Sequence, residues 1–584
     1  MTSTIHKFQL IMTKPNTYTN PILPGNHPDP SIIRSGKNYF LITSSFEYFP
    51  GIPIYHSTDL ISWKLISHAL TRRSQLDIRT PEPGGGIWAP TIREHDGWFY
   101  ITAACFDRYR PQEDQRIWPR GFYVKCKAED VFGGEWSEPV WFDEVGFDQD
   151  LFFGDDGKVY LSTTRRKHER TTTESLKDFA IHITTIDLST GASTSVPQVI
   201  RSSPSGIAEG SHIFKRGKFY YLFTAEGGTE SGHCEWVSRS STGPLGPWET
   251  IDAPLWKIGV EGDEVVNTGH IDIVEDEKGN WWAVMLACRP IKLDDGFKTF
   301  ASMPGDYDKV PGGWKSSIFG RETFLVPVTW EDDWPIVNDG KKITLQGEGP
   351  GLYQLKQPTK WRDDFTSPEL QLGWYRKNTP QKQDFQITTH PPSLRLHGNP
   401  YTLTSPASPT LFLRKQTSRT GVWSTRLTFN PTTPQMEAGT VVYWNHHTHA
   451  SISIHGNHWA NSTKRTIQFH LLINGKDNWT VIGALQKDDD DVILYIWCRD
   501  NGYIFGYRPC EEEDEKAIRW LGETTIDEIT TDPLIGAPFT GMMLGVYATG
   551  NGDSGTTPAD FKYVEFDTEM VPDPIVDQQF TCCG

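Results

Sequence analysis

The sequence predicts an all-β protein of two domains, a five-bladed β-propeller followed by a β-sandwich. Three observations lead to this fold class. A unit of about sixty residues recurs along the first part of the chain, and each unit holds a glycine turn followed by an aromatic strand. After a Gly- and Lys-rich stretch the pattern changes to short alternating strands. At 584 residues the chain is too long for one ordinary core, so two or more domains are expected.

Each repeat consists of a polar or acidic lead, a short apolar run, a glycine turn and an aromatic strand. The turn glycines are separated by 61, 60, 60 and 62 residues, and an aromatic residue follows three positions after each. Glycine supplies the positive φ of a tight hairpin turn, and alternating polar and apolar residues fit a half-buried strand. The glycines are Gly36, Gly97, Gly157, Gly217 and Gly279, and the aromatic residues are Tyr39, Tyr100, Tyr160, Tyr220 and Trp282.

Between these hairpins lie further pairs of strand-like runs, such as IPIYHSTDLISWKLI and EWSEPVWF. Two hairpins in each period form a four-stranded sheet, and five such sheets arranged radially form a β-propeller. A β-solenoid and a string of small sandwiches are the alternatives. Solenoid repeats are usually shorter, and a unit of about sixty residues cannot bury a sandwich core alone. The propeller is therefore preferred.

Composition shifts mark the domain boundaries. Residues 1–20 are expected to be an N-terminal tail and residues 21–338 the propeller. The stretch NDGKKITLQGEGPG begins a linker over 339–360. From 361 to 584, runs such as LRLHG, TIQFHLLI and VILYIW alternate with turn signals, as in a β-sandwich.

Charge and apolar patterning exclude several classes of partner. A net charge of -18 and a pI near 5.5 repel phosphate backbones, so we expect no nucleic acid partner. No apolar run approaches the roughly 18–20 residues of a membrane helix, so we expect no membrane partner. FQLIM near the N-terminus is too short for a signal-peptide core, and eight cysteines lack metal-ligand spacing. We expect a cytoplasmic protein, or a secreted one if this N-terminus is incomplete; the oligomeric state stays open, a homo-oligomer included.

The repeat leads should meet at one end of the propeller channel, because the innermost strands line it. These leads carry three carboxyl groups, an indole and an imidazole, although they lie about sixty residues apart in the sequence. The residues are Asp29, Trp88, Asp148, Glu209 and His270.

Three carboxyl groups around one axis indicate glycosidic-bond cleavage. That reaction needs one carboxylic acid to protonate the leaving oxygen and one carboxylate to assist a nucleophile. Crowded like charges push pKa values apart, so that one group keeps its proton while another is ionised. A third carboxyl group can tune and orient the acid. Asp150 falls on the same strand face as Asp148 and is an alternative for this third position.

At these residues the sequence resembles glycoside hydrolase family 43, the five-bladed propeller enzymes that act on xylan and arabinan. The resemblance implies an inverting mechanism with Asp29 as general base, Asp148 as the pKa-modulating and orienting acid, and Glu209 as general acid. Many relatives have PEGPH at the acid, where this chain has IAEGSH, so the loop on the leaving-group side is expected to differ. The resembling stretches are NPILPGNHPDPSII, TSSFEYFPGIPIYHSTDLISWKLI, GGIWAPTIR, GFDQDLFFGDDGKVYL, AEGSHIFKRGKFYYLFTAEGGTESGH, TGHIDIV and GRETFL.

The resemblance implies further site residues. Phe46 and Trp88 match positions that wall the pocket of the terminal sugar. Arg321 in GRETF matches an arginine that donates hydrogen bonds to sugar hydroxyls. His270 matches an axial histidine that in some relatives holds a water or a calcium ion. Calcium favours oxygen ligands. We therefore expect no required cofactor, and a structural calcium ion or a water at His270 stays open.

The C-terminal domain resembles the accessory sandwich of family members with β-xylosidase activity, in which a sandwich loop makes the pocket a dead end. The alternative is a carbohydrate-binding module on a linker. Residues 165–180, RRKHERTTTESLKDFA, resemble an insertion that could wall the subsites. The predicted function is exo-acting, inverting hydrolysis of xylan-derived oligosaccharides by a β-1,4-xylosidase with α-L-arabinofuranosidase activity. The alternatives are an α-L-arabinofuranosidase that debranches arabinoxylan and a non-catalytic carbohydrate-binding propeller.

Overall fold

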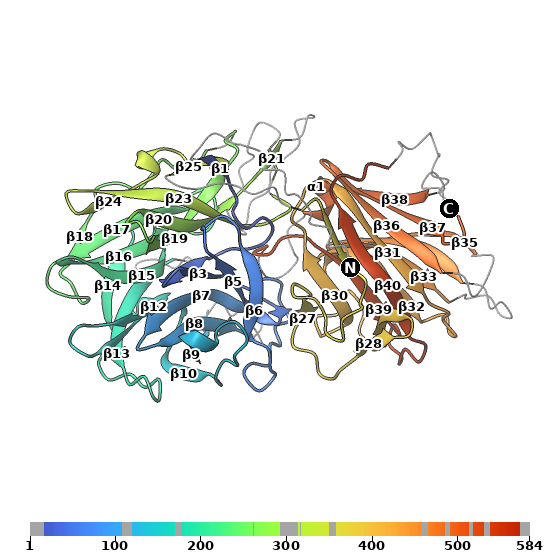
Figure 1. Cartoon of the computed structure of the whole chain (residues 1–584), viewed down its shortest axis with the longest axis horizontal. Coiled ribbons are helices and arrows are strands. Elements are labelled where there is room, and N and C mark those ends of the chain that lie inside the picture. Colours follow the sequence, from blue (N-terminus) through green and yellow to red (C-terminus); the bar gives the residue numbers. More distant parts are fainter. Residues whose placement is uncertain are drawn as a thin grey trace, which may run out of the picture.

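The computed structural model describes residues 17–107, 119–169, 177–260, 262–292, 314–315, 317–349, 358–456, 465–484, 491–512, 518–530, 536 and 538–572. In this part of the chain nearly all regular structure is strand, so the predicted all-β fold is confirmed. Figure 1 shows two bodies side by side, the first coloured blue to green and the second yellow to red. No helix among the described residues is long and apolar enough to cross a membrane.

Five four-stranded antiparallel sheets lie in the described part of residues 31–337. The first hairpin of every sheet turns at one of the five predicted glycines, whose φ values lie between 58° and 83°. In hydrogen-bonding order the sheets are β2 (Ser31–Ser35), β3 (Asn38–Ile42), β5 (Gly51–Ser57) and β6 (Lys64–Leu70); β7 (Gly86–His95), β8 (Trp98–Phe106), β9 (Arg120–Lys127) and β10 (Val140–Val145); β11 (Phe147–Phe153), β12 (Val159–Arg166), β13 (Phe179–Ile186) and β14 (Gln198–Ser202); β15 (Ala208–Arg216), β16 (Phe219–Glu226), β17 (Cys234–Ser240) and β18 (Glu249–Thr250); and β19 (Val266–Glu275), β20 (Trp281–Cys288), β23 (Glu322–Glu331) and β24 (Trp334–Val337).

The first strands of the five sheets contact one another in a closed ring, in the order β2, β7, β11, β15, β19 and back to β2. The first sheet contains only N-terminal strands and the fifth only strands from 266–337, so no shared sheet closes this ring. Between the inner strands β19 and β2 a side-chain contact spans the junction, where the Ser31 hydroxyl donates to the Asp272 carboxylate at 2.6 Å.

The predicted tail and linker both contribute to this junction. β1 (Thr17–Thr19) pairs with β25 (Gln346–Glu348), although residues 1–20 were expected to be a tail and 339–360 a linker. Tyr18 is 1% exposed, and its hydroxyl donates to the Leu325 carbonyl at 2.7 Å. Both segments pack on the fifth sheet: Tyr18 lies in an apolar cluster with Trp282 and Leu325, and Ile343 lies in another with Val326 and Val328.

The C-terminal domain is a β-sandwich, as predicted. Its two antiparallel sheets enclose an apolar core that includes Leu394, Trp423 and Ile452. One sheet consists of β28 (Phe385–Thr389), β29 (Pro392–Leu396), β40 (Ala559–Asp567), β31 (Gly421–Thr428), β36 (Val492–Arg499), β37 (Gly502–Pro509) and β38 (Arg519–Thr525), with β26 (Lys360–Asp363) beside β40; the other consists of β30 (Thr410–Lys415), β39 (Met543–Thr549), β32 (Glu437–Asn445), β33 (Thr448–His455), β34 (Thr466–Ile473) and β35 (Lys476–Ala484).

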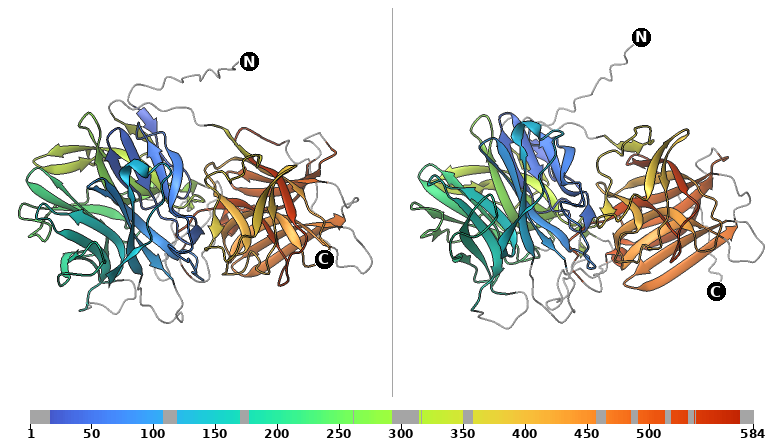
Figure 2. Two further views of the ribbon diagram at one scale, coloured as in Figure 1. Left: turned by 60° about the horizontal axis from the view of Figure 1, so that its bottom comes forward. Right: turned by 90° about the horizontal axis from the view of Figure 1, so that it is seen from below.

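The sandwich is docked tightly against the propeller, and both views of Figure 2 show the two domains in contact. β4 (Tyr48–Phe49) of the propeller pairs with β27 (Arg376–Lys377). The Met542 N–H donates to the Ile318 carbonyl at 2.7 Å, and the Ile318 side chain joins the sandwich core. A backbone ladder and a shared core favour a fixed accessory domain over a module on a free linker.

Truncation of the shared core should destabilise the whole chain. Ile318 is 2% exposed, so Ile318→Ala should lower the free energy of unfolding by about 2–4 kcal/mol, through lost burial and a residual cavity. The control Leu372→Ala, at a side chain that is 47% exposed, should change it by less than about 0.5 kcal/mol. Denaturant titration followed by tryptophan fluorescence measures both. Equal effects of the two variants would contradict the shared core.

Candidate active site

The repeat leads lie where the innermost strands depart from regular sheet. Asp29, Asp148 and His270 have φ values of 54°, 53° and 54°, and Ala89 and Gly210 occupy the same region at 34° and 57°. The register of β7, β11, β15 and β19 against the next strand shifts at these positions. A β-bulge turns a side chain out of the sheet's alternation, and such strained backbone concentrates at functional sites. The bulges therefore aim the lead side chains towards one place.

Asp29 is held by three neighbours. The Ser44 hydroxyl donates to its Oδ2 at 2.5 Å, and Arg321 Nη1 donates to its Oδ1 at 2.9 Å. His270 Nδ1 lies 3.7 Å from the same Oδ1. Asp29 is 6% exposed, so these contacts orient the carboxyl group in a largely water-free place.

Asp148 and Glu209 influence each other's protonation. Burial, and to a smaller extent the charge of Asp29, raise the pKa of Asp148 to about 7. The Gly210 N–H donates to Asp148 Oδ2 at 2.8 Å, and this hydrogen bond acts in the opposite direction, lowering the pKa. Burial raises the pKa of Glu209 well above its usual range, and the charges of Asp148 and Glu230 add to this effect. A raised pKa favours the protonated form of Glu209, which is the form a general acid needs.

Arg321 joins Asp29 to the sandwich domain. Its Nη2 donates to the Phe539 carbonyl at 3.4 Å, and its Nη1 also donates to the Thr229 hydroxyl at 3.2 Å. The guanidinium carbon lies 5.6 Å from the Phe46 ring and 5.4 Å from the Phe539 ring. The guanidinium is thereby fixed between two aromatic faces and a carboxylate.

Three aromatic rings stand over this group. The Phe46 and Phe539 ring centroids are 6.1 Å apart, and Trp88 lies 6.0 Å from Phe539, nearly perpendicular to it. The Trp88 indole N–H donates to the Gly84 carbonyl at 2.7 Å, which fixes the ring. The structure thus brings together all seven residues named from the sequence, and it adds Thr229 and Phe539. No motif marks Phe539, which arrives from the other domain; Thr229 lies in the resembling stretch EGGTESGH but received no role there.

Asp150, the alternative to Asp148, has a different environment. It is 1% exposed, its Oδ1 lies 2.9 Å from Arg93 Nε, and its Oδ2 accepts the Ile213 N–H at 2.9 Å. Arg93 and a backbone amide therefore engage both of its oxygens. Of these two aspartates, Asp148 is the one whose charge raises the pKa of Glu209.

The surroundings of His270 do not fit a calcium ion. Burial lowers the pKa of His270 to about 3 despite the charge of Asp29, so the ring is neutral. Calcium takes about six to eight oxygen ligands, whereas the ring neighbouring His270 is His212, at 5.8 Å, and Asp29 already binds Arg321. Within the described ranges no group of three or more His, Cys, Asp or Glu side chains could hold a metal ion.

The ends of segment 165–180 border the strand that carries Glu209; residues 170–176 lie outside the described part. Phe179 forms a parallel bridge with Ile207, and its N–H donates to the Gly206 carbonyl at 3.0 Å. Its ring lies 5.5 Å from Phe147, which precedes Asp148. The C-terminal end of the segment is thus paired with the backbone two residues before Glu209.

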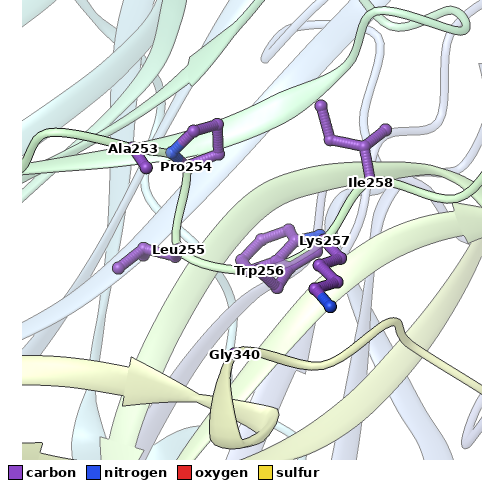
Figure 3. A pocket seen from close by; sticks show the side chains of 7 residues that line it. All are labelled: Ala253, Pro254, Leu255, Trp256, Lys257, Ile258 and Gly340. Carbon is purple, nitrogen blue, oxygen red and sulfur yellow. The ribbon is translucent and has the colours of Figure 1, made fainter.

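A shallow hollow lies apart from the lead residues (Figure 3). It encloses about 430 Å³ between residues 253–258 and Gly340. Its lining is apolar except for Lys257, and no carboxyl group contributes to it. The hollow therefore lacks the groups for the chemistry that the lead residues support.

Comparisons with known proteins identify the family of the chain. The family model described as Glycosyl hydrolases family 43 matches residues 18–335, and the one described as Beta xylosidase C-terminal Concanavalin A-like domain matches residues 362–567. A non-reducing end alpha-L-arabinofuranosidase of Bacteroides ovatus is 33% identical over 561 residues, which cover 94% of this chain and 94% of that protein.

Two further relatives extend the likeness along the chain. A beta-xylosidase of Bacillus subtilis is 29% identical over 563 residues, covering 94% of this chain and 99% of that protein. The crystal structure of a xylan beta-1,4-xylosidase from Bacillus halodurans has a TM-score of 0.81 at 28% identity, covering 94% of this chain and 99% of that one. The predicted fold class, a propeller followed by a concanavalin A-like sandwich, is confirmed. With its catalytic-domain model spanning more than half of the sequence, the chain belongs to glycosyl hydrolase family 43 and is a glycoside hydrolase.

Proposed function

We propose that the protein is an exo-acting, inverting β-1,4-xylosidase that removes terminal xylose from xylo-oligosaccharides and also releases terminal α-L-arabinofuranosyl groups. The observation that carries the proposal is the cluster of Asp29, Asp148 and Glu209 beside Arg321 and its aromatic rings, of which the sandwich contributes Phe539. The relatives named as beta-xylosidase and alpha-L-arabinofuranosidase support this choice of sugars.

The proposed reaction is a single displacement. The Asp29 carboxylate, oriented by Ser44 and Arg321, removes a proton from a water molecule as that water attacks the anomeric carbon. Glu209 gives its proton to the glycosidic oxygen as the bond to the leaving sugar breaks. The proton of Glu209 leaves in the new hydroxyl of the leaving sugar, so the cycle closes when Asp29 loses its proton to solvent and Glu209 takes one up from solvent.

Asp148 acts on the acid rather than on the sugar. Its charge raises the pKa of Glu209, and its Oδ2 accepts the N–H of Gly210, the residue that follows Glu209. The same carboxyl group therefore keeps the acid protonated and holds the backbone beside it.

Aromatic rings from both domains support the proposed exo action. The rings of Phe46, Trp88 and Phe539 lie within about 6 Å of their neighbours around Arg321. A wall made by two domains favours a chain end over the middle of a polysaccharide. A binding-only propeller is less well supported, because binding does not need a carboxyl group with a raised pKa.

Replacing the general acid should abolish most of the catalysis and leave substrate binding largely intact. Glu209→Gln should lower kcat on xylobiose by about a thousandfold or more, while xylobiose binding changes little. Aryl xylosides with a good leaving group should lose less, since they need less protonation. Steady-state kinetics and calorimetric titration measure the two effects. The control Glu249→Gln, at a side chain that is 65% exposed, should behave as wild type; full activity of Glu209→Gln would remove Glu209 from the mechanism.

Glu230 should set the alkaline limit of activity. Its charge raises the pKa of Glu209, so Glu230→Gln should lower that pKa. Because the acid works only when protonated, activity is lost as pH rises through its pKa, and the loss should now begin at a lower pH. The profile of kcat/KM against pH on xylobiose measures this limb. An unmoved alkaline limb, with Glu249→Gln as reference, would argue against this electrostatic role.

The anomer released first tests the mechanism and the sugar together. Proton NMR of early 4-nitrophenyl β-xyloside hydrolysis should show α-xylose before mutarotation, because single displacement inverts the β linkage and the nitrophenyl leaving group contributes no sugar. Turnover of 4-nitrophenyl β-xyloside should exceed that of 4-nitrophenyl α-L-arabinofuranoside. Initial β-xylose would reject the inverting mechanism, whereas faster arabinofuranoside turnover would reverse only the sugar preference.

A further inference from the structure

A buried ion cluster lies on the strands that carry the lead residues. Arg93 on β7 places Nε 2.9 Å from Asp150 Oδ1 and Nη1 2.9 Å from Asp272 Oδ2. Its Nη2 lies 3.1 Å from His212 Nδ1, and Ser31 donates to Asp272. Asp150, His212, Asp272 and Ser31 belong to β11, β15, β19 and β2, so every strand of the inner ring contributes.

The charges in this cluster require a cation. The side chains of Asp150 and Asp272 are 1% and 6% exposed, and buried carboxylates are costly unless they are paired and hydrogen-bonded. Backbone amides of Ile213 and Ile32 donate to them at 2.9 and 3.1 Å, but amides carry no net charge. Arg93 is the guanidinium that contacts both carboxylates.

Arg93 also determines what His212 can do. Because Arg93 donates to Nδ1, the neutral imidazole carries its proton on Nε2. A protonated ring nitrogen donates hydrogen bonds and cannot bind a metal ion. The His212 ring lies 5.8 Å from that of His270, whose Nδ1 lies 3.7 Å from Asp29 Oδ1. The cluster is thus connected through two imidazoles to the proposed base.

We propose that Arg93 takes the place of a divalent cation at the centre of the inner ring. It neutralises Asp150 and Asp272, fixes the tautomer of His212 and so positions the groups beneath Asp29 without a metal. Removal of the guanidinium would leave the two carboxylates that it contacts and the Nδ1 of His212 without it, a set of donors that a calcium ion could join. The inference does not depend on which sugar the enzyme cleaves.

Thermal unfolding of the full chain tests this exchange. Arg93→Ala should lower the midpoint in EDTA by roughly 5–10 °C, because two buried carboxylates lose their partner. Millimolar calcium should restore much of that loss. Wild type should have the same midpoint in EDTA and in calcium. Calorimetric titration should find about one calcium ion bound per Arg93→Ala chain. Wild type should bind no more calcium than the Arg395→Ala protein, which serves as the control.

The matched control is Arg395→Ala, which removes an arginine that makes two 2.7 Å hydrogen bonds to Asp560 in the sandwich. It should be destabilised with no response to calcium, since a lone carboxylate makes a poor calcium site. The triple variant with Arg93→Met, Asp150→Asn and Asp272→Asn should likewise ignore calcium. These controls separate a replaced cation from the general loss of an ion pair.

Three results would overturn the proposal. One is a wild-type midpoint that falls in EDTA. Another is an Arg93→Ala protein that is destabilised yet neither binds calcium nor responds to it. If Arg93→Ala does not fold as expressed, it should refold from denaturant only with calcium present, and failure in both media would also overturn the inference. Inactivity of wild type on xylosides would instead contradict the proposed function and leave these stability comparisons unaffected.

Discussion

The structure depends on how backbone N–H groups are satisfied where the innermost strands bulge. A buried N–H without an acceptor is costly, and a bulge takes such groups out of the ladder. Carboxyl groups of the preceding sheet accept them: Asp148 accepts from Gly210, and Asp150 accepts from Ile213. The acids beside the proposed catalytic centre are therefore structural acceptors as well as charges.

The same arrangement continues around the ring. Ser31 of the first sheet accepts the Ile92 N–H of the second at 3.1 Å, and Asp272 of the fifth accepts the Ile32 N–H of the first. This last contact lies at the junction that no shared sheet closes. Polar side chains thus link the inner strands of neighbouring sheets. Two of these side chains are the carboxylates of Asp150 and Asp272, and Arg93 neutralises both.

What the sequence could predict follows from how local each signal is. A turn glycine with an aromatic residue three positions later is a local pattern, so all five hairpins could be placed from the repeat. The position of Asp148 relative to Gly146 and Phe147 is equally local, and the motif carries it. The pairing of residues 17–19 with 346–348 was missed, because it joins segments that are remote in sequence and individually unremarkable.

Arg93 and Phe539 show the other limit. In TIREHDGW, Arg93 looks like an ordinary exposed charge of a half-buried strand, and only the ring geometry places it between Asp150 and Asp272. Phe539 reaches Arg321 because Ile318 and Met542 fix the sandwich beside it. A charge partner and a pocket wall are properties of packing between distant segments, which no short motif records.

This difference explains why a short motif predicts the position of Asp148 more directly than it predicts a cation at His270. Asp148 accepts the N–H of Gly210 at the bulge that follows Glu209, and Asp29 is held by Ser44 and Arg321. Each of these contacts involves residues that lie in a short motif. A channel cation depends instead on the net charge that five strands bring together, and one arginine on one strand can replace it. Here the neutral His270, the protonated Nε2 of His212 and the occupied oxygens of Asp150 all follow from that arginine or from burial. The charge balance at the centre of this ring therefore depends on Arg93, which belongs to none of the motifs that carry the three acids.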